Sequence, residues 1–446
     1  MNFVIIGGDA AGMSAASRAK RNDPELNVVV LEQTRDVSYS ACGMPYNVAD
    51  PQRAMDDLVV RPAEVFRAKQ GIDVRLGHRV EAIDPAARRV SGITINGERF
   101  VVDYDRLLIA TGARPIRPDL PGIDLPEVAV LKTLEDGRHL KALLAEHRAR
   151  RVAILGMGYI ALEMAEALRQ RGMAVVMIKP RAGLLPWMAP ELAAAVRTEL
   201  EAHDVALHDG QVLERIEARA GGLHLSGPDF DLDADTVVAA VGVKPNSELA
   251  AAAGIELGPS GAVAVDRRLQ TSAPDVYAAG DCADAWHVVS GKRVWIPLAL
   301  RANRAGWAVA DNVTGSSTEL PGIAGTAVFK VFGLEAARSG LTVHEAQQVG
   351  FEPETVTIRT RTRAHAHPGS GTLHVHMVGD GRSGRLLGAQ MVGTEGAAHR
   401  INAAAVALHA GMTVADFAQC DLSYAPPFGP VWDPLLTAAN QLLKRL

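Results

Sequence analysis

Cys42 lies in a segment that could support thiol chemistry, residues 38–46 (Ser-Tyr-Ser-Ala-Cys-Gly-Met-Pro-Tyr). A single cysteine is more often a small buried hydrophobic residue. This segment, however, is polar, contains glycine and proline, and is expected to open a helix. Backbone N–H groups at a helix start stabilise a thiolate, so the pattern predicts a lowered pKa and a reactive sulfur at Cys42. We interpret Cys282 and Cys420 as structural.

Two glycine-rich turns could bind phosphate. Residues 7–12 (Gly-Gly-Asp-Ala-Ala-Gly) and 156–161 (Gly-Met-Gly-Tyr-Ile-Ala) each follow an apolar strand and precede a helix. Small residues there let N–H groups and a helix N-terminus approach a pyrophosphate. The first turn has Asp9 in place of the middle glycine, so by itself it fits a ligand-free βα turn equally well. The second turn is closer to the dinucleotide pattern.

The strand that follows each turn ends in a residue that could select the nucleotide. Glu32 ends the first of these strands and is placed to accept hydrogen bonds from a ribose. Lys179 stands at the equivalent strand end, with Arg181 two residues on. Cations there pair with a 2′-phosphate, which favours NADPH over NADH. The alternative is that both cations simply face solvent.

The elements around these turns form a repeat. Strand 3–6, helix 11–21 and strand 28–31 recur as strand 152–155, a helix to about 171 and strand 175–178. Further strands are predicted at 107–112, 237–241 and 276–281, and from residue 321 long strands at 326–332, 354–360, 372–379 and 386–393 precede helices. The pattern predicts an α/β protein with two nucleotide-binding Rossmann-like domains and a C-terminal α+β module.

Composition excludes several classes of protein. The chain has 446 residues, with 46 Lys and Arg against 51 Asp and Glu and a net charge of −5, so net charge attracts neither nucleic acid nor an anionic membrane. Three scattered cysteines form no disulfide framework or metal site. No leader or membrane-spanning stretch is apparent. These features predict a soluble, cytoplasmic protein that binds small molecules, with no metal.

Several motifs together resemble one family. They are Cys42 with Gly-Met-Pro-Tyr, the second turn with Tyr159 and Glu163, Ala110-Thr111-Gly112, Ala279-Gly280-Asp281 and Tyr424-Ala-Pro-Pro-Phe428. The chain resembles, over essentially its whole length, the single-cysteine FAD-dependent pyridine nucleotide-disulfide oxidoreductases. Within that family it is most similar to coenzyme A-disulfide reductases and their NADH oxidase and persulfide reductase relatives.

The resemblance implies domains and cofactor contacts. Residues 1–115 and 244–320 would form the FAD-binding domain, 116–243 the NAD(P)-binding domain and 321–446 a dimerisation domain, with no fused sulfurtransferase domain. The implied FAD contacts are Gly7, Gly8, Ala11, Gly12, Glu32, Gln33, Val80, Ala110, Thr111, Gly112, Asp281 and Ala299. The implied NAD(P)H contacts are Gly156, Gly158, Tyr159, Ile160, Glu163, Lys179, Arg181 and Gly242.

The resemblance also implies a homodimer in which Tyr424 reaches the partner's active site. The implied coenzyme A contacts are Ser14, Arg18, Arg21, Ser38, Arg61 and Trp432. For Arg18 and Arg21, which lie on the first helix, a basic helix face in contact with solvent is an equally good explanation. His367 lies nearest the family's second C-terminal tyrosine, and it is either a proton donor or a loop histidine. Ala41 replaces a typical Asn, and Ala10 replaces the His of peroxidases and water-forming oxidases.

These inferences predict an enzyme that passes electrons from NAD(P)H through FAD and Cys42 to coenzyme A disulfide or a related low-molecular-weight disulfide or persulfide. The alternatives are an NAD(P)H oxidase that reduces oxygen, and a non-catalytic flavoprotein that senses redox state. The departures at Ala41 and Ala10 leave the disulfide substrate open.

Overall fold

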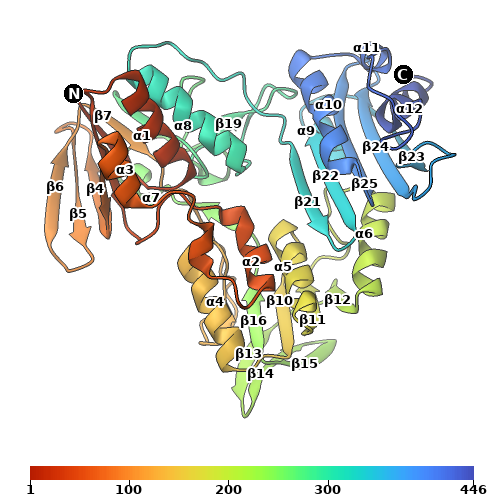
Figure 1. The fold of residues 1–446 in the computed structure, drawn as a ribbon, viewed down its shortest axis with the longest axis horizontal. Coiled ribbons are helices and arrows are strands. Elements are labelled where there is room, and N and C mark those ends of the chain that lie inside the picture. The colour runs from red at the N-terminus through yellow and green to blue at the C-terminus, as the bar shows by residue number, and fades with distance from the viewer.

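The computed structural model describes residues 1–446 and shows three bodies, each built around its own sheet (Figure 1). The N-terminal body lies at the left of the figure, the second body below it, and the C-terminal body at the right. The first two contain parallel sheets and the third an antiparallel sheet. The predicted fold class is confirmed.

The first body holds a five-stranded parallel sheet, which apolar side chains bury on both faces. In spatial order its strands are β18 (Val276–Ala278), β7 (Arg106–Ile109), β1 (Asn2–Ile6), β2 (Asn27–Glu32) and β3 (Asp73–Leu76). Helix α1 (Ala10–Asn22) packs along α8 (Ala299–Val313), and α3 (Ala63–Gln70) contacts β3. An antiparallel sheet of β4 (His78–Asp84), β5 (Arg89–Thr94) and β6 (Arg99–Asp103) forms the left edge of this body (Figure 1).

The second body repeats the parallel arrangement. Its strands are β12 (Val205–Asp209), β11 (Ala174–Lys179), β10 (Arg151–Leu155), β16 (Thr236–Ala239) and β9 (Val128–Ala129). Its helices are α4 (Leu134–Glu146), α5 (Tyr159–Gln170) and α6 (Pro190–Ala202), and a small antiparallel sheet holds β13 (Arg215–Arg219), β14 (Gly222–Gly227) and β15 (Phe230–Ala234). The chain passes between the two bodies through β8 (Ala113–Pro115) and β17 (Val243–Pro245), which pair antiparallel.

The third body is an antiparallel sheet in the order β21-β22-β25-β24-β23. The strands are β21 (Ala327–Val331), β22 (Leu334–Gly340), β25 (Leu386–Gly393), β24 (Thr372–Asp380) and β23 (Pro353–Arg361). Its helices are α9 (Val343–Gln348), α10 (Ala397–Ala410), α11 (Val414–Ala418) and α12 (Pro434–Leu442). The sequence patterns predict four of these strands but not β22, because its small residues show little apolar alternation. Strand β22 forms because it pairs with β21 on one side and β25 on the other.

The remaining short elements are η1 (Ala41–Gly43), α2 (Met44–Ala49), η2 (Met55–Leu58), α7 (Glu248–Ala252), η3 (Pro259–Gly261), β19 (Ala285–Trp286) and β20 (Arg293–Val294). We found no helix whose length and apolar character would let it cross a bilayer. The domain boundaries proposed from the sequence stay predictions.

The α1–α8 contact depends on a small residue at the crossing. A Cβ on Gly306 of α8 would lie 2.3 Å from the Ala11 carbonyl oxygen, and backbone cannot move aside cheaply. In α4, a Cβ on Gly137 would meet only the flexible Met55 side chain, at 2.7 Å. We predict that Gly306→Ala lowers the free energy of unfolding by about 1–3 kcal/mol. Gly137→Ala should cost less, because alanine favours a helix by up to about 1 kcal/mol. Thermal unfolding of the two variants measures this, and equal losses would contradict it.

Candidate active site

Cys42 lies in the short 3₁₀ turn η1, which runs directly into helix α2. Pro45 stands in the first turn of α2, where its missing N–H costs no hydrogen bond. Cys42 is a free cysteine that solvent reaches, although the protein around it partly desolvates the thiol. The expectation that this segment opens a helix is confirmed.

Helix α2, which follows the first glycine turn and β2 in the chain, packs against α5 of the second body (Figure 1). Cys42 directly precedes α2, and acidic groups of both bodies act on it, so it lies near this contact. Met44 and Val48 of α2 belong to the same apolar cluster as Leu162 of α5. Phe329 and Val331 of β21 also belong to this cluster. One core therefore joins the cysteine helix, the helix after the second glycine turn and the C-terminal sheet.

The burial of the Cys42 thiol and the charges around it contradict the predicted lowering of its pKa. Burial by the surrounding protein, and next the Glu163 carboxylate, raise the pKa of the Cys42 thiol. Lys132 opposes this effect, whereas Asp281 and Asp9 add to it. The prediction of a lowered pKa was wrong because it considered only the start of the helix, and not the burial of the thiol or the carboxylates near it. Burial of the thiol is the larger cause, and the carboxylates that the fold brings near it add to the effect.

Lys132 is the cation whose charge opposes the effect of these carboxylates on the pKa of Cys42. Its ammonium lies 2.8 Å from Asp281 Oδ2 in an ion pair whose side chains are largely buried. Burial raises the pKa of Asp9 to about 6, and Lys132 and the Tyr39 N–H act against the rise. Lys132 is therefore the one cation that acts on Cys42 among several acidic groups, and it does not cancel their effect.

The two glycine turns have the same geometry. Gly7 has φ +107°, and a Cβ on it would lie 2.2 Å from the Ala110 oxygen. Gly156 has φ +108°, and a Cβ on it would lie 2.4 Å from the Ala240 oxygen. Helices α1 and α5 both start without a side-chain cap, which leaves first-turn N–H groups for a phosphate. The residues present fit a dinucleotide at each turn.

Glu32 is buried at the end of β2 and closes the first turn. Its Oε2 accepts a hydrogen bond from Gly8 N at 2.7 Å, and its Oε1 accepts from the amide and the hydroxyl of Thr34, both at 2.8 Å. Thr111 and Gly112 stand at the end of β7, where Asn246 is hydrogen-bonded to both. Of the other proposed FAD contacts, Gln33 and Ala299 are exposed, and Ala11 and Gly12 are buried in α1 while Val80 lies on β4.

The second turn leads to a cluster of polar groups at the ends of β11 and β12. Lys179 Nζ donates to the Gly183 carbonyl at 2.7 Å, and Arg181 is exposed beside it. Asp209 is held by Arg197 at 2.7 Å and by Gly183 N at 2.6 Å. Ile160 and Glu163 follow on α5, and Gly242 follows β16 with φ +122°.

Tyr159 begins α5 and packs between two aromatic rings. Its ring lies 4.9 Å from that of Phe329 and 5.6 Å from that of Trp187, edge-on to the latter. Tyr159 therefore ties the start of α5 to the C-terminal body. One turn further along α5, Glu163 Oε1 accepts a hydrogen bond from the Tyr46 hydroxyl at 2.9 Å.

Two of the three proposed coenzyme A contacts on α1, Ser14 and Arg18, already have partners on α8. Ser14 donates to Asn303 at 2.6 Å, and Arg18 makes two bonds to Asp311 at 2.8 and 3.1 Å. Arg21 is exposed at the end of the helix. Ser38 lies in the segment that leads to Cys42 with φ 50°, and Arg61 lies over the Phe66 ring at 5.3 Å.

Tyr424 and His367 lie on two neighbouring loops of the C-terminal body. The loops contact each other through the hydrogen bond from Ala364 N to the Pro426 oxygen, 3.1 Å long. Tyr424 is 47% exposed, and Trp432 on the same loop is 64% exposed. His367 lies within 3.0 Å of its neighbour's carbonyl oxygen, that of Pro368. Large exposed rings on one loop are typical of a surface that another molecule covers.

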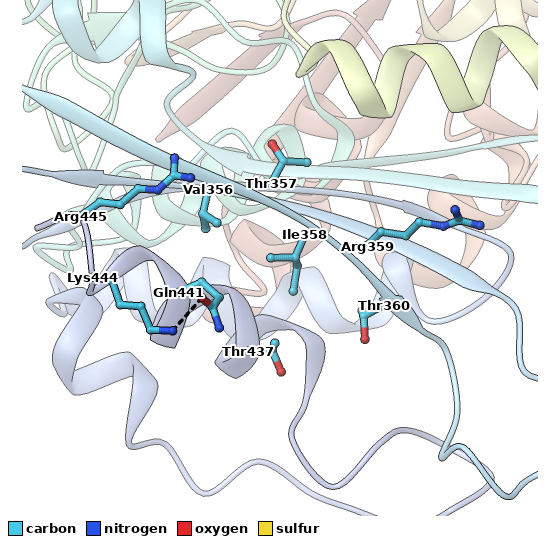
Figure 2. A pocket seen from close by; sticks show the side chains of 9 residues that line it. All are labelled: Val356, Thr357, Ile358, Arg359, Thr360, Thr437, Gln441, Lys444 and Arg445. Carbon is cyan, nitrogen blue, oxygen red and sulfur yellow. Dashed lines mark hydrogen bonds between the residues drawn. The ribbon is translucent and has the colours of Figure 1, made fainter.

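A cavity of about 440 Å³ lies elsewhere, between β23 and α12 (Figure 2). Figure 2 shows Arg359 and Arg445 at opposite ends of it, with Lys444 hydrogen-bonded to Gln441. Its cations do not converge, and it includes none of the residues proposed above. It is not the candidate active site.

Comparison with known proteins identifies the class. The model of the pyridine nucleotide-disulphide oxidoreductases matches residues 1–306, and that of their dimerisation domain matches 326–434. The chain belongs to this family, as its motifs predict, and is a pyridine nucleotide-dependent flavoprotein oxidoreductase.

Three relatives are similar along the whole chain. The "NAD(P)H sulfur oxidoreductase (CoA-dependent)" of Pyrococcus furiosus is 40% identical, with 98% of each chain covered. The "NAD(P)H coenzyme A polysulfide/persulfide reductase" of Pyrococcus horikoshii is 39% identical over the same shares. The solved structure of an NAD-dependent persulfide reductase from A. fulgidus is 35% identical, with a TM-score of 0.96 over all of this chain and 83% of that one.

Sequence reasoning missed Lys132 and the role of Tyr46. Lys132 directly precedes the capping box of α4, formed by Thr133 and Asp136, so the sequence marks it only as the residue before a helix. Tyr46 lies in the Cys42 motif, in the first turn of α2 and four residues after Cys42. The four-residue spacing could have indicated that Tyr46 lies near Cys42. Its hydrogen bond to Glu163 could not be predicted, because Glu163 is far away in the sequence.

Proposed function

We propose that this protein uses NAD(P)H to reduce coenzyme A disulfide or a related persulfide, with FAD on the first glycine turn, NAD(P)H on the second and Cys42 as the reacting sulfur. The names of the similar Pyrococcus and A. fulgidus proteins support this proposal. Bound FAD would supply the two-electron transfer between nicotinamide and sulfur.

The observation that carries the proposal is the placement of a single accessible cysteine at the contact between the two nucleotide-binding bodies. Cys282 is buried, with its sulfur against the carbonyl oxygens of Ile109 and Ala279, and Cys420 lies in the C-terminal body. Cys42 thus has no second protein cysteine to pair with, and the resolving thiol must come from the substrate. A small disulfide or persulfide provides it.

The chemistry at Cys42 follows from thiol–disulfide exchange. The Cys42 thiolate attacks one sulfur of the disulfide, so that a Cys42–S–S–coenzyme A bond forms and one coenzyme A thiolate leaves. Two electrons that originate in NAD(P)H then cleave this mixed disulfide. Cys42 and a second coenzyme A are released as thiols after protons are taken up, and NAD(P)⁺ is the oxidised product.

The second subunit completes the site in this proposal. The C-terminal bodies of two copies pair, and the partner's Tyr424 approaches Cys42, with His367 beside that loop as a proton donor. Coenzyme A lies along Ser14, Arg18, Arg21, Ser38 and Arg61 toward Trp432. The exposed Tyr424 and Trp432 rings and the match to a dimerisation domain support this arrangement.

We predict that Cys42→Ser lowers the anaerobic rate of NAD(P)H oxidation with coenzyme A disulfide by at least about 10³-fold, because the attacking sulfur is lost. FAD content and reduction of the bound flavin by NAD(P)H should persist. Cys420→Ser is the matched control and should keep the rate. Turnover with oxygen alone, or an unchanged rate in Cys42→Ser, would contradict the proposal.

We further propose that NADPH is the preferred donor. Lys179 and Arg181 stand at the strand end where the ribose phosphate would lie, and Arg197 and Gly183 N already neutralise the nearby Asp209. A 2′-phosphate would therefore meet two cations and no free carboxylate from β12.

Lys179→Ala should raise KM for NADPH by about tenfold, because a charge-assisted contact to the phosphate is lost. KM for NADH should change little, since NADH has no 2′-phosphate. Steady-state kinetics with both donors measures the difference. An equal rise for NADH and NADPH would show that Lys179 only maintains the loop.

A further inference from the structure

Lys141 of α4 reaches from the second body to the C-terminal end of the cysteine helix α2. Its ammonium donates to the carbonyl oxygens of Asn47 at 3.2 Å and Asp50 at 2.7 Å. It also donates to the Arg53 carbonyl oxygen and, at 3.1 Å, to Asn47 Oδ1. An ammonium has three N–H donors, so four acceptor oxygens leave none of them free. Lys141 therefore joins the end of α2 to the turn that follows it.

Arg171, the residue after α5, adds a second cation at the same end of α2. Its Nη1 donates to the Val48 carbonyl oxygen at 3.1 Å. Carbonyl groups at the end of a helix lack an intrahelical donor and carry partial negative charge, so cations are favourable there. Helix α2 has only six residues, so few of its own hydrogen bonds hold these groups. Lys141 and Arg171 supply the donors that the helix lacks.

The acceptors of both cations are backbone and amide oxygens, with no carboxylate among them. Both side chains are half-buried, and burial lowers the pKa of each. The charge of Arg171 further lowers the pKa of Lys141, so the two cations repel each other. Surface ion pairing therefore does not explain why they meet here, whereas the free oxygens of the α2 segment do.

The segment between Cys42 and this end of α2 is short and well packed. Asn47 is fully buried, and its Nδ2 donates to the Ala54 carbonyl oxygen at 2.7 Å. Met44 and Val48 are buried in the apolar cluster shared with α5. Cys42 lies in η1, which runs into α2 without a break. A displacement at the end of α2 therefore reaches Cys42 over a few residues.

We propose that Lys141 and Arg171 are positioning residues that hold α2 at its C-terminal end and thereby fix the place of Cys42. Each acts on the cysteine through the backbone of α2. Because both come from the second body, the place of the cysteine depends on the body that carries the second glycine turn. The inference rests on the proposed function only in taking Cys42 as the reacting residue.

Hydrogen–deuterium exchange of the full-length holoenzyme tests the hold on α2, measured on the peptide that covers residues 42–53. Lys141→Met should speed exchange there by about tenfold, because hydrogen bonds from a charged donor are lost. Arg171→Met should act in the same direction by less, since it removes one bond. Lys141→Arg should keep most of the protection, because a guanidinium also donates to several carbonyl groups. Exchange over residues 2–22 should not change.

Alkylation of Cys42 in the same proteins tests whether the hold on α2 extends to the sulfur. The rate with iodoacetamide, followed by the mass of the Cys42 peptide, should rise about threefold or more in Lys141→Met, because a loosened α2 opens the partly desolvated thiol. Lys141→Arg should keep the rate of the unmodified protein. Neither measurement needs turnover of a disulfide, so a wrong substrate would not alter either result.

Lys69→Met is the matched control, because Lys69 is exposed in the last turn of α3 in the first body. Both of its readouts should equal those of the unmodified protein. Unchanged exchange over residues 42–53 in Lys141→Met and Arg171→Met would overturn the proposal, as would the full changes in Lys69→Met or Lys141→Arg. Faster exchange over residues 2–22 as well would show a general loss of stability instead. Faster exchange of α2 with an unchanged alkylation rate would show that Cys42 is placed independently, and either result would also overturn the proposal.

Discussion

The packing of α2 against α5 is the constraint on which the rest of the structure depends. Cys42 is on a segment too short to hold its place alone, and Met44 and Val48 anchor that segment in an apolar cluster shared with α5 and β21. The same cluster sets the direction of α5, which carries Tyr159 and Glu163. The sulfur, the second glycine turn and the C-terminal sheet are therefore positioned by one core.

Burial and charge near the contact between α2 and α5 affect how readily the Cys42 thiol loses its proton. The thiol is partly desolvated and faces more carboxylates than cations, so the protein chain alone keeps it protonated more than a free thiol. Lys132 is the group that limits this effect. The groups that change the pKa of the Cys42 thiol come from both nucleotide-binding bodies.

Local patterns predicted the repeat, both glycine turns and the helix after Cys42, because each depends on residues that are neighbours in the sequence. Strand β22 could not be predicted, since its small residues are fixed by pairing with β21 and β25. The pKa of Cys42 could not be predicted either. Glu163, Lys132 and Asp281 are far from it in the chain, and only the packing of three bodies brings their charges together.

The most direct test is the mass of the Cys42 peptide from the full-length holoenzyme after incubation with coenzyme A disulfide. The account predicts an adduct of coenzyme A mass on Cys42 that disappears when NAD(P)H is added under anaerobic conditions. A bare thiol throughout, or a sulfur that carries only oxygen and ignores coenzyme A disulfide, would contradict it.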